Sequence, residues 1–185
     1  TADATPTPVI SFSVQAKGAA GAINLTASHN PPADQGFKVR DALGAALAPD
    51  ALADLEERLP GPDASIDAMP LAEARRSGLI RVFDPAPDYR AFVADRIDLD
   101  RVAAAGLQVA YDPMWGAGIG WLAWLLGPSA KTRLLAIHNE PNPAFPEMRQ
   151  PEPIPPNTDA LGRHVRRTAA DLGIVNDGDA DRIGL

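Results

Sequence analysis

Cysteine is absent from this chain of 185 residues. Its absence excludes disulfide bridges, thiolate metal sites and a cysteine nucleophile, and it is compatible with a reducing compartment, so we expect a cytoplasmic protein. Aromatic residues make up only 5% of the sequence, and long apolar runs are missing. The longest, at residues 119–126, is far shorter than the ~20 residues that span a bilayer, so we expect no membrane partner.

Basic residues are also in short supply. The chain has 17 Lys and Arg against 24 Asp and Glu, which gives a formal net charge of -7 and a pI of about 4.9. Nucleic acids and anionic membranes bind basic surfaces, so we expect neither as a partner. A phosphorylated small molecule remains a suitable ligand, because a local arginine and a bound metal can hold a phosphate whatever the overall charge.

The densest acidic pattern lies near the end of the sequence. Asp177, Asp179 and Asp181 occupy alternate positions after a short apolar run at residues 172–175, which predicts a buried strand followed by an acidic turn. Carboxylates this close repel one another unless a cation lies among them. Because the turn offers only oxygen ligands, the cation we expect is Mg²⁺ or Mn²⁺ rather than zinc.

Two other interpretations of these aspartates remain open. An EF-hand also begins Asp-x-Asp-x-Asp, but it requires glycine at the sixth position, where this chain has Arg182. A solvated acidic turn would need no metal at all. Arg182 favours the metal site, because a guanidinium directly after the third aspartate is suited to hold a phosphate. A metal loop beside a phosphate-binding arginine indicates phosphoryl chemistry.

A second candidate segment is the turn Ser-His-Asn-Pro-Pro at residues 28–32, after a predicted buried strand at residues 22–27. Asn30 precedes a proline and is therefore pushed away from helical backbone angles, and two successive prolines stiffen the turn. Such a turn can hold the hydroxyl of Ser28 still. On its own, however, a serine here is most often a turn-stabilising residue.

Helix and strand patterns alternate along the rest of the chain. We predict helices that begin near Asp50, with residues 52, 55 and 59 on one face, and at residues 70–78, 119–126 and 158–172; strands at residues 36–40, 79–83, 107–111, 132–137 and 174–176; and either type at residues 9–14. In the last helix we expect residues 161, 165 and 172 to face inward and the arginines at 163, 166 and 167 to face water.

This alternation implies a mainly parallel sheet covered by helices. The proline-containing residues 84–87 form the predicted linker, so we divide the chain into domains at residues 1–84 and 85–185. In such sheets ligands gather beyond the carboxyl ends of the strands, where the turn of Ser28 and the acidic turn could meet.

Three motifs occur in a fixed order: Thr-Ala-Ser-His-Asn-Pro-Pro at residues 26–32, Gly-Phe-Lys at residues 36–38 and Asp-Gly-Asp-Ala-Asp-Arg at residues 177–182. In this combination they resemble the α-D-phosphohexomutase family, the phosphoglucomutases and phosphomannomutases. The resemblance implies two α/β/α three-layer domains with mainly parallel mixed sheets. The first domain, incomplete, would carry a phosphoserine loop and the second a metal loop, so we expect a fragment that lacks the family's third and fourth domains.

The resemblance also implies residue roles. Ser28 would carry the phosphate and complete a Mg²⁺ site with the three aspartates, Arg182 would stabilise the phosphate oxygens, and Asn30 would hold the phosphate loop. Lys38 and His29 are both candidates for the general base. A lysine crowded by Arg182 and Mg²⁺ would have a lowered pKa.

The activity implied is the interconversion of hexose 1- and 6-phosphates through a hexose 1,6-bisphosphate, with a hexose phosphate as partner. Thr26 resembles the glucose and mannose members more than the glucosamine members, which tend to carry serine there. We expect this chain by itself to be inactive. The alternative is a non-catalytic, Mg²⁺-dependent phosphosugar-binding module.

Overall fold

A computed structural model gives the fold of residues 1, 3–61 and 64–185. The elements are α1 (Thr7–Ala16), β1 (Ala22–Leu25), β2 (Phe37–Arg40), α2 (Pro49–Glu57), α3 (Leu71–Arg76), α4 (Ala86–Ala94), α5 (Leu99–Ala104), β3 (Gln108–Asp112), α6 (Trp121–Leu126), β4 (Arg133–Ala136), α7 (Asp159–Thr168), β5 (Leu172–Asn176) and β6 (Ile183–Gly184). Residues 9–14, which fit either pattern, belong to helix α1.

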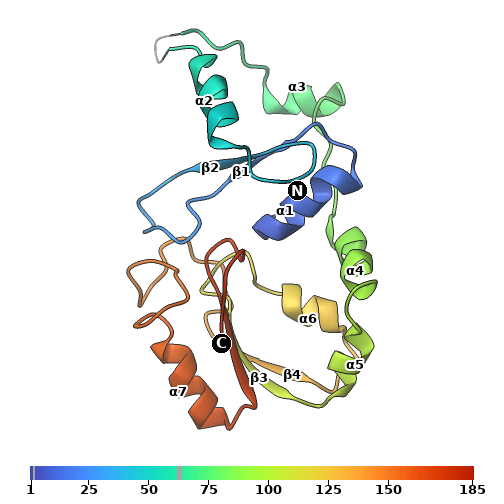
Figure 1. The fold of residues 1–185 in the computed structure, drawn as a ribbon, viewed down its shortest axis with the longest axis vertical. Coiled ribbons are helices and arrows are strands. Elements are labelled where there is room, and N and C mark those ends of the chain that lie inside the picture. Colours follow the sequence, from blue (N-terminus) through green and yellow to red (C-terminus); the bar gives the residue numbers. More distant parts are fainter. Residues whose placement is uncertain (2, 62–63) are drawn as a thin grey trace.

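The larger sheet has the strand order β4-β3-β5-β6. β3 pairs in parallel with β4 and β5, whereas β6 is antiparallel to β5. Figure 1 shows α7 on one side of this sheet and α4, α5 and α6 on the other. Ala110, Met114, Leu161 and Val175 form the core between the sheet and α7. The predicted α/β class with a mainly parallel mixed sheet is therefore confirmed.

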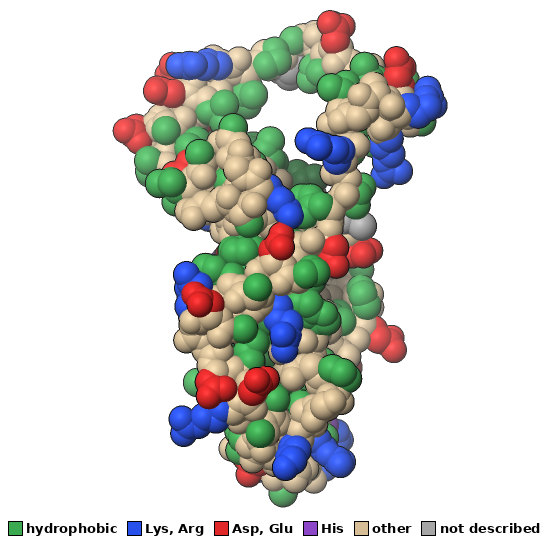
Figure 2. All heavy atoms as spheres, turned by 90° about the vertical axis from the view of Figure 1, so that its right-hand side faces the viewer, with side chains coloured by type: hydrophobic (Ala, Val, Ile, Leu, Met, Phe, Trp, Pro, Cys, Tyr) green, Lys and Arg blue, Asp and Glu red, His purple; other side chains and the backbone are tan. Residues whose placement is uncertain are grey.

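The smaller sheet pairs β1 and β2 in antiparallel fashion. The prediction that residues 22–27 form a buried strand is wrong in its burial, because Ile23 and Leu25 are 70% and 81% exposed. Alternation along the strand instead turns Asn24, which is buried, toward the interior. Figure 2 shows this N-terminal part of the molecule with hydrophobic side chains on its surface and an opening through it.

The predicted strand at residues 79–83 is also wrong. This segment has no regular structure in the described chain, and Leu79 and Val82 are 71% and 56% exposed. An apolar run forms a strand only where a neighbouring strand can accept its backbone hydrogen bonds, and none of the described strands lies beside this one.

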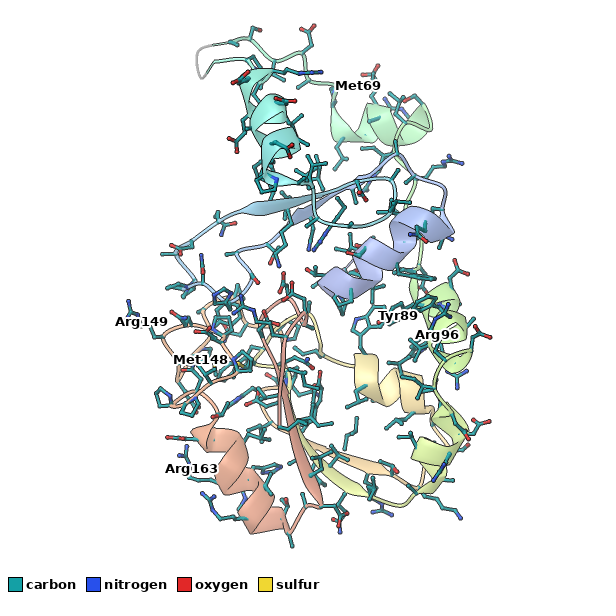
Figure 3. The ribbon with its side chains drawn as sticks, in the orientation of Figure 1. Met69, Tyr89, Arg96, Met148, Arg149 and Arg163 are labelled. Carbon is teal, nitrogen blue, oxygen red and sulfur yellow. The ribbon has the colours of Figure 1, made fainter. Side chains whose placement is uncertain are left out.

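The last two residues of the predicted linker at 84–87 already belong to helix α4, which begins at Ala86. A proline is tolerated in a first helical turn, where its missing N–H has no partner in any case. Rings from α4 then pack on α1, since the centroid of Phe12 lies 5.4 Å from that of Tyr89 and 4.8 Å from that of Phe92. Figure 3 shows Tyr89 between the two helices. The domain division after residue 84 stays a prediction.

Two details of the predicted helices need correction. The residue before α2 is Ala48, so Asp50 lies inside the first turn and is not the cap. Helix α7 ends at Thr168, and Leu172 belongs to β5, where it is 38% exposed instead of facing inward. The buried Leu161 agrees with the prediction, and Figure 3 shows Arg163 on the outer side of the helix. Over the described residues, no helix combines the length and the apolar character that a membrane crossing requires.

Candidate active site

The acidic loop follows β5 directly. Asp177 is fully buried and Asp179 is 5% exposed, and one carboxylate oxygen from each of these and from Asp181 lie within 4.8 Å of one another. The backbone N–H groups of Asp181 and Arg182 donate to Asp177 Oδ1 at 3.0 and 2.9 Å and close the loop. Converging carboxylates, two of them buried, are a donor set that suits a hard divalent cation.

Burial raises the pKa of Asp177 to about 6, and the neighbouring charges of Asp179 and Asp181 add to this effect against the hydrogen bond from the Arg182 N–H. Burial alone would also raise the pKa of Asp179. Hydrogen bonds from Lys38 and Thr7 outweigh burial and hold the pKa of Asp179 below its ordinary value. Asp177 is thus the carboxyl that lacks a compensating cation, and the residues present fit a bound metal.

Ser28 reaches this loop from the other part of the molecule. Its Oγ lies 3.2 Å from Asp179 Oδ1 and 3.5 Å from Asp177 Oδ2. The backbone of Ser28 is left-handed, with φ of 55°, a conformation that non-glycine residues rarely adopt. The Ser28 N–H donates to Thr26 Oγ1 at 2.8 Å, which helps to hold this turn.

Glycines allow the two segments to come this close. A Cβ on Gly178 would lie 2.7 Å from the carbonyl oxygen of Ser28, and a Cβ on Gly116 would lie 2.3 Å from the carbonyl oxygen of Gly178. Both distances are shorter than any ordinary contact with carbon. The N–H of Ala117 donates to the same Gly178 oxygen at 2.9 Å, so the loop after β3 packs against the acidic loop and holds its backbone in place.

Lys38 lies among the oxygens of the site. Its Nζ is 2.7 Å from Asp181 Oδ2, 2.9 Å from Asp179 Oδ2 and 3.2 Å from Ser28 Oγ. Burial lowers the pKa of Lys38, but the hydrogen bonds and charges of the two carboxylates outweigh burial and raise it. The pKa lowering expected from the sequence does not occur while these carboxylates are its partners.

Three other predicted residues make no hydrogen bond to Ser28 among the described residues. His29 Nδ1 is buried without a hydrogen-bond partner there. Asn30 is exposed and lines a cleft. The guanidinium of Arg182 lies 3.3 Å from Glu152 Oε1, beside the loop.

The hydroxyls around Asp179 did not emerge from the sequence as site residues. Thr7 Oγ1 and Thr26 Oγ1 donate to Asp179 Oδ2 at 2.8 and 3.1 Å, and Asn24 Nδ2 donates to Thr7 Oγ1 at 2.6 Å. Thr26 lies within the motif of Ser28, but Thr7 is 172 positions from Asp179 along the chain. No sequence motif of the site includes Thr7.

A cleft of about 910 Å³ opens beside Ser28 and Asp179. Trp115 and Phe145 form part of its wall. Its volume is in the range of small-molecule sites.

His138, to which the sequence assigned no role, supports this wall. Its ring stacks on Trp115 at 3.8 Å between centroids, and its Nδ1 lies 2.9 Å from the carboxylate of the fully buried Asp112.

Comparison with known proteins agrees with this geometry. Residues 1–64 match the family model described as phosphoglucomutase/phosphomannomutase, alpha/beta/alpha domain I, and residues 87–185 match the model of alpha/beta/alpha domain II. The fold is thus one of α/β/α domains, as predicted. The chain belongs to the phosphoglucomutase/phosphomannomutase family, and the resemblance identified from the motifs is confirmed.

Individual relatives carry several names. A probable phosphoglucosamine mutase of Methanothermobacter thermautotrophicus is 33% identical over 96% of this chain, and a phosphopentomutase of Thermococcus kodakarensis is 33% identical over 100%. A crystal structure of a putative phosphomannomutase from Thermus thermophilus matches 97% of the chain with a TM-score of 0.83 and 30% identity. The chain spans 37% and 38% of the lengths of these two relatives and 39% of the crystallised chain.

Proposed function

We propose that this chain forms the phosphoserine and metal-binding part of a phosphohexomutase, an isomerase that moves phosphate between the 1- and 6-positions of a hexose. The observation that carries the proposal is the approach of Ser28 Oγ to Asp177 and Asp179, which are 149 and 151 positions away in the chain. A hydroxyl held against buried carboxylates and a lysine suits the transfer of a phosphoryl group, since such transfer depends mainly on position and charge.

In this proposal the Ser28 oxygen carries a phosphoryl group. The phosphoryl passes to the free hydroxyl of a bound hexose monophosphate, whose proton passes to a base. The bond from phosphorus to Ser28 breaks, and the Ser28 oxygen takes a proton from an acid. The product is a hexose 1,6-bisphosphate, whose other phosphate later returns to Ser28. Asp177, Asp179 and Asp181 would hold a Mg²⁺ ion that withdraws charge from the phosphoryl group.

Lys38 serves this reaction as a cation in the arrangement seen here. While it is paired with Asp179 and Asp181 its pKa is raised, so its ammonium donates hydrogen bonds to Ser28 and to the incoming phosphate oxygens. Lys38 can act as the base only when a bound metal engages these carboxylates in its place, and His29 is the other candidate. Separate Lys38→Met and His29→Gln variants distinguish them, because only loss of the base removes the acidic-side dependence of the transfer rate on pH, in which the rate falls as the base becomes protonated.

The first experiment is an intact-mass measurement. Incubation of the chain with Mg²⁺ and glucose 1,6-bisphosphate is expected to add about 80 Da, the mass of one phosphoryl group. Ser28→Ala should abolish the adduct, whereas Ser65→Ala, which removes an exposed serine outside the site, should retain it. An adduct that survives Ser28→Ala would refute the role of Ser28. Absence of any adduct together with Mg²⁺-dependent binding of hexose phosphates would favour the non-catalytic module.

We further propose that this chain accepts phosphate without completing an isomerisation, because it spans little more than a third of the length of its relatives. Hexose 1-phosphates of glucose, mannose and glucosamine should each fail to yield the 6-phosphate. The rate at which each discharges the Ser28 phosphate would rank them as substrates. The names of the relatives also justify a pentose phosphate as a fourth substrate in this comparison.

A further inference from the structure

We propose that Thr7 and Asn24 are positioning residues that fix the orientation of the Asp179 carboxylate and thereby set the metal affinity of the site. This inference deepens the proposed function and rests on it. Neither residue lies in a sequence motif of the site, and neither is expected to touch the metal, although Asn24 is among the residues that line the cleft.

Thr7, the first residue of α1, donates two hydrogen bonds to Asp179. The N–H of Thr7 donates to the carbonyl oxygen of Asp179 at 2.9 Å, and the Thr7 hydroxyl lies 2.8 Å from Asp179 Oδ2. The first N–H groups of a helix have no partner within the helix, so the acidic loop satisfies one of them. Thr7 is 2% exposed, which leaves no water to replace either bond.

Asn24 fixes the direction in which the O–H bond of Thr7 points. The Asn24 amide donates to Thr7 Oγ1 at 2.6 Å, and Asn24 is itself only 7% exposed. A hydroxyl has a single proton, and a carboxylate can only accept. The Asn24 NH2 group can only donate, so it cannot accept the Thr7 proton. The Thr7 hydroxyl therefore donates that proton to Asp179 Oδ2. Two buried neutral groups thus form one directed chain of hydrogen bonds that ends on a charged oxygen.

This chain selects which oxygen of Asp179 faces the reacting group. Oδ2 is engaged by Thr7, Thr26 and Lys38, whereas Oδ1 lies 3.2 Å from Ser28 Oγ. Rotation of the carboxylate would break several of these bonds at once. Hydrogen bonds that orient metal-ligating carboxylates typically change metal affinity about 10- to 100-fold when they are removed. We therefore expect Thr7 to act on the metal through Asp179.

The experiment is a titration of the chain with Mn²⁺, in which free Mn²⁺ is measured by electron paramagnetic resonance. Thr7→Val keeps the shape of the side chain and removes its hydroxyl, and it should weaken Mn²⁺ binding about tenfold. Thr7→Ser restores the hydroxyl and should bind as the wild type does. Ser13→Ala is the matched control, because Ser13 is a buried serine of the same helix whose hydroxyl donates to Val9 O and not to the acidic loop.

The outcomes separate this inference from the proposed function. Equal Mn²⁺ affinity of wild type and Thr7→Val would overturn the positioning role and leave the metal site intact. A loss of affinity in Ser13→Ala equal to that in Thr7→Val would overturn it as well, because the effect would then follow from helix stability. Failure of the wild type to bind Mn²⁺ would refute the metal site itself and the inference with it.

If circular dichroism shows that Thr7→Val does not fold, the same Mn²⁺ titration of an Asn24→Leu variant tests the inference instead. This change leaves the Thr7 hydroxyl in place but removes the amide that orients it, so Mn²⁺ affinity should fall measurably, though less than after removal of the hydroxyl itself. Wild-type affinity in a folded Asn24→Leu chain would overturn the role of the directed chain.

Discussion

Replacement of Asp177 by asparagine should make the metal-free protein more stable, although it removes a residue of the proposed active site. Asp177 is fully buried, and its pKa is raised from 3.8 to about 6. The protonated carboxyl therefore stabilises the folded state fully below about pH 4, and this contribution is lost as the pH rises through about 6. The difference between the two pKa values corresponds to about 3 kcal/mol of unfolding free energy at pH 8.

Asparagine keeps the favourable contacts of Asp177. Its side-chain oxygen can still accept the N–H groups of Asp181 and Arg182, while its uncharged amide replaces Oδ2, which lies 3.5 Å from Ser28 Oγ. We therefore expect a gain of about 2–3 kcal/mol at pH 8 and almost none at pH 4. For a chain of this size, that gain raises Tm by about 5–10 °C.

The assay is urea unfolding in EDTA, followed by circular dichroism at pH 4 and pH 8, with Asp67→Asn as a control at an exposed carboxylate. Added Mg²⁺ should reverse the order, because it stabilises only the protein that retains Asp177. A D177N chain that is no more stable than the wild type at pH 8 in EDTA would refute the electrostatic reasoning. Equal stabilisation of both chains by Mg²⁺ would refute the role of Asp177 as a ligand.

Three further changes test the packing and charge of the site. Lys38→Met should tighten Mn²⁺ binding about tenfold in equilibrium titrations, because the ammonium no longer competes for the carboxylates; weaker binding would show that Lys38 supports the metal. Gly116→Ala should cost at least about 2 kcal/mol in urea unfolding, since its Cβ would lie 2.3 Å from a carbonyl oxygen. Gly61→Ala, with no described atom within 4 Å, is its control, and equal losses would contradict the contact. Leu161→Ala should cost about 2–5 kcal/mol by the same assay, because Leu161 is 5% exposed in the core under α7; a loss below about 1 kcal/mol would contradict that burial.

Hydrophobic periodicity correctly predicted those helices and strands whose packing partners follow from the α/β fold class. Strands β3 and β5 and helix α7 lie where the pattern of their residues predicts them, because each belongs to the larger sheet or packs on its face. The strand at residues 79–83 failed for the opposite reason. Its residues are as apolar as those of a true strand, but the described chain brings no second strand beside them.

Burial proved harder to predict than secondary structure. In β1 the apolar Ile23 and Leu25 are exposed and the polar Asn24 is buried, the reverse of the usual alternation. Asn24 is turned inward because it donates to Thr7, and that bond is visible only once α1 lies against β1. Helix α4 was missed because two prolines near its start favoured a linker, although a proline in the first turn is compatible with a helix.

The motifs of Ser28 and of the three aspartates were sufficient to identify the family and to predict its α/β/α architecture, because both depend on residue types at short spacing. Only the tertiary structure decided that Lys38 is paired with Asp179 and Asp181, and that Thr7 and Asn24 direct a hydrogen bond onto Asp179. Hydrogen-bond direction and pKa depend on distances of about 3 Å between residues far apart in the chain, and no local pattern of side chains encodes such distances.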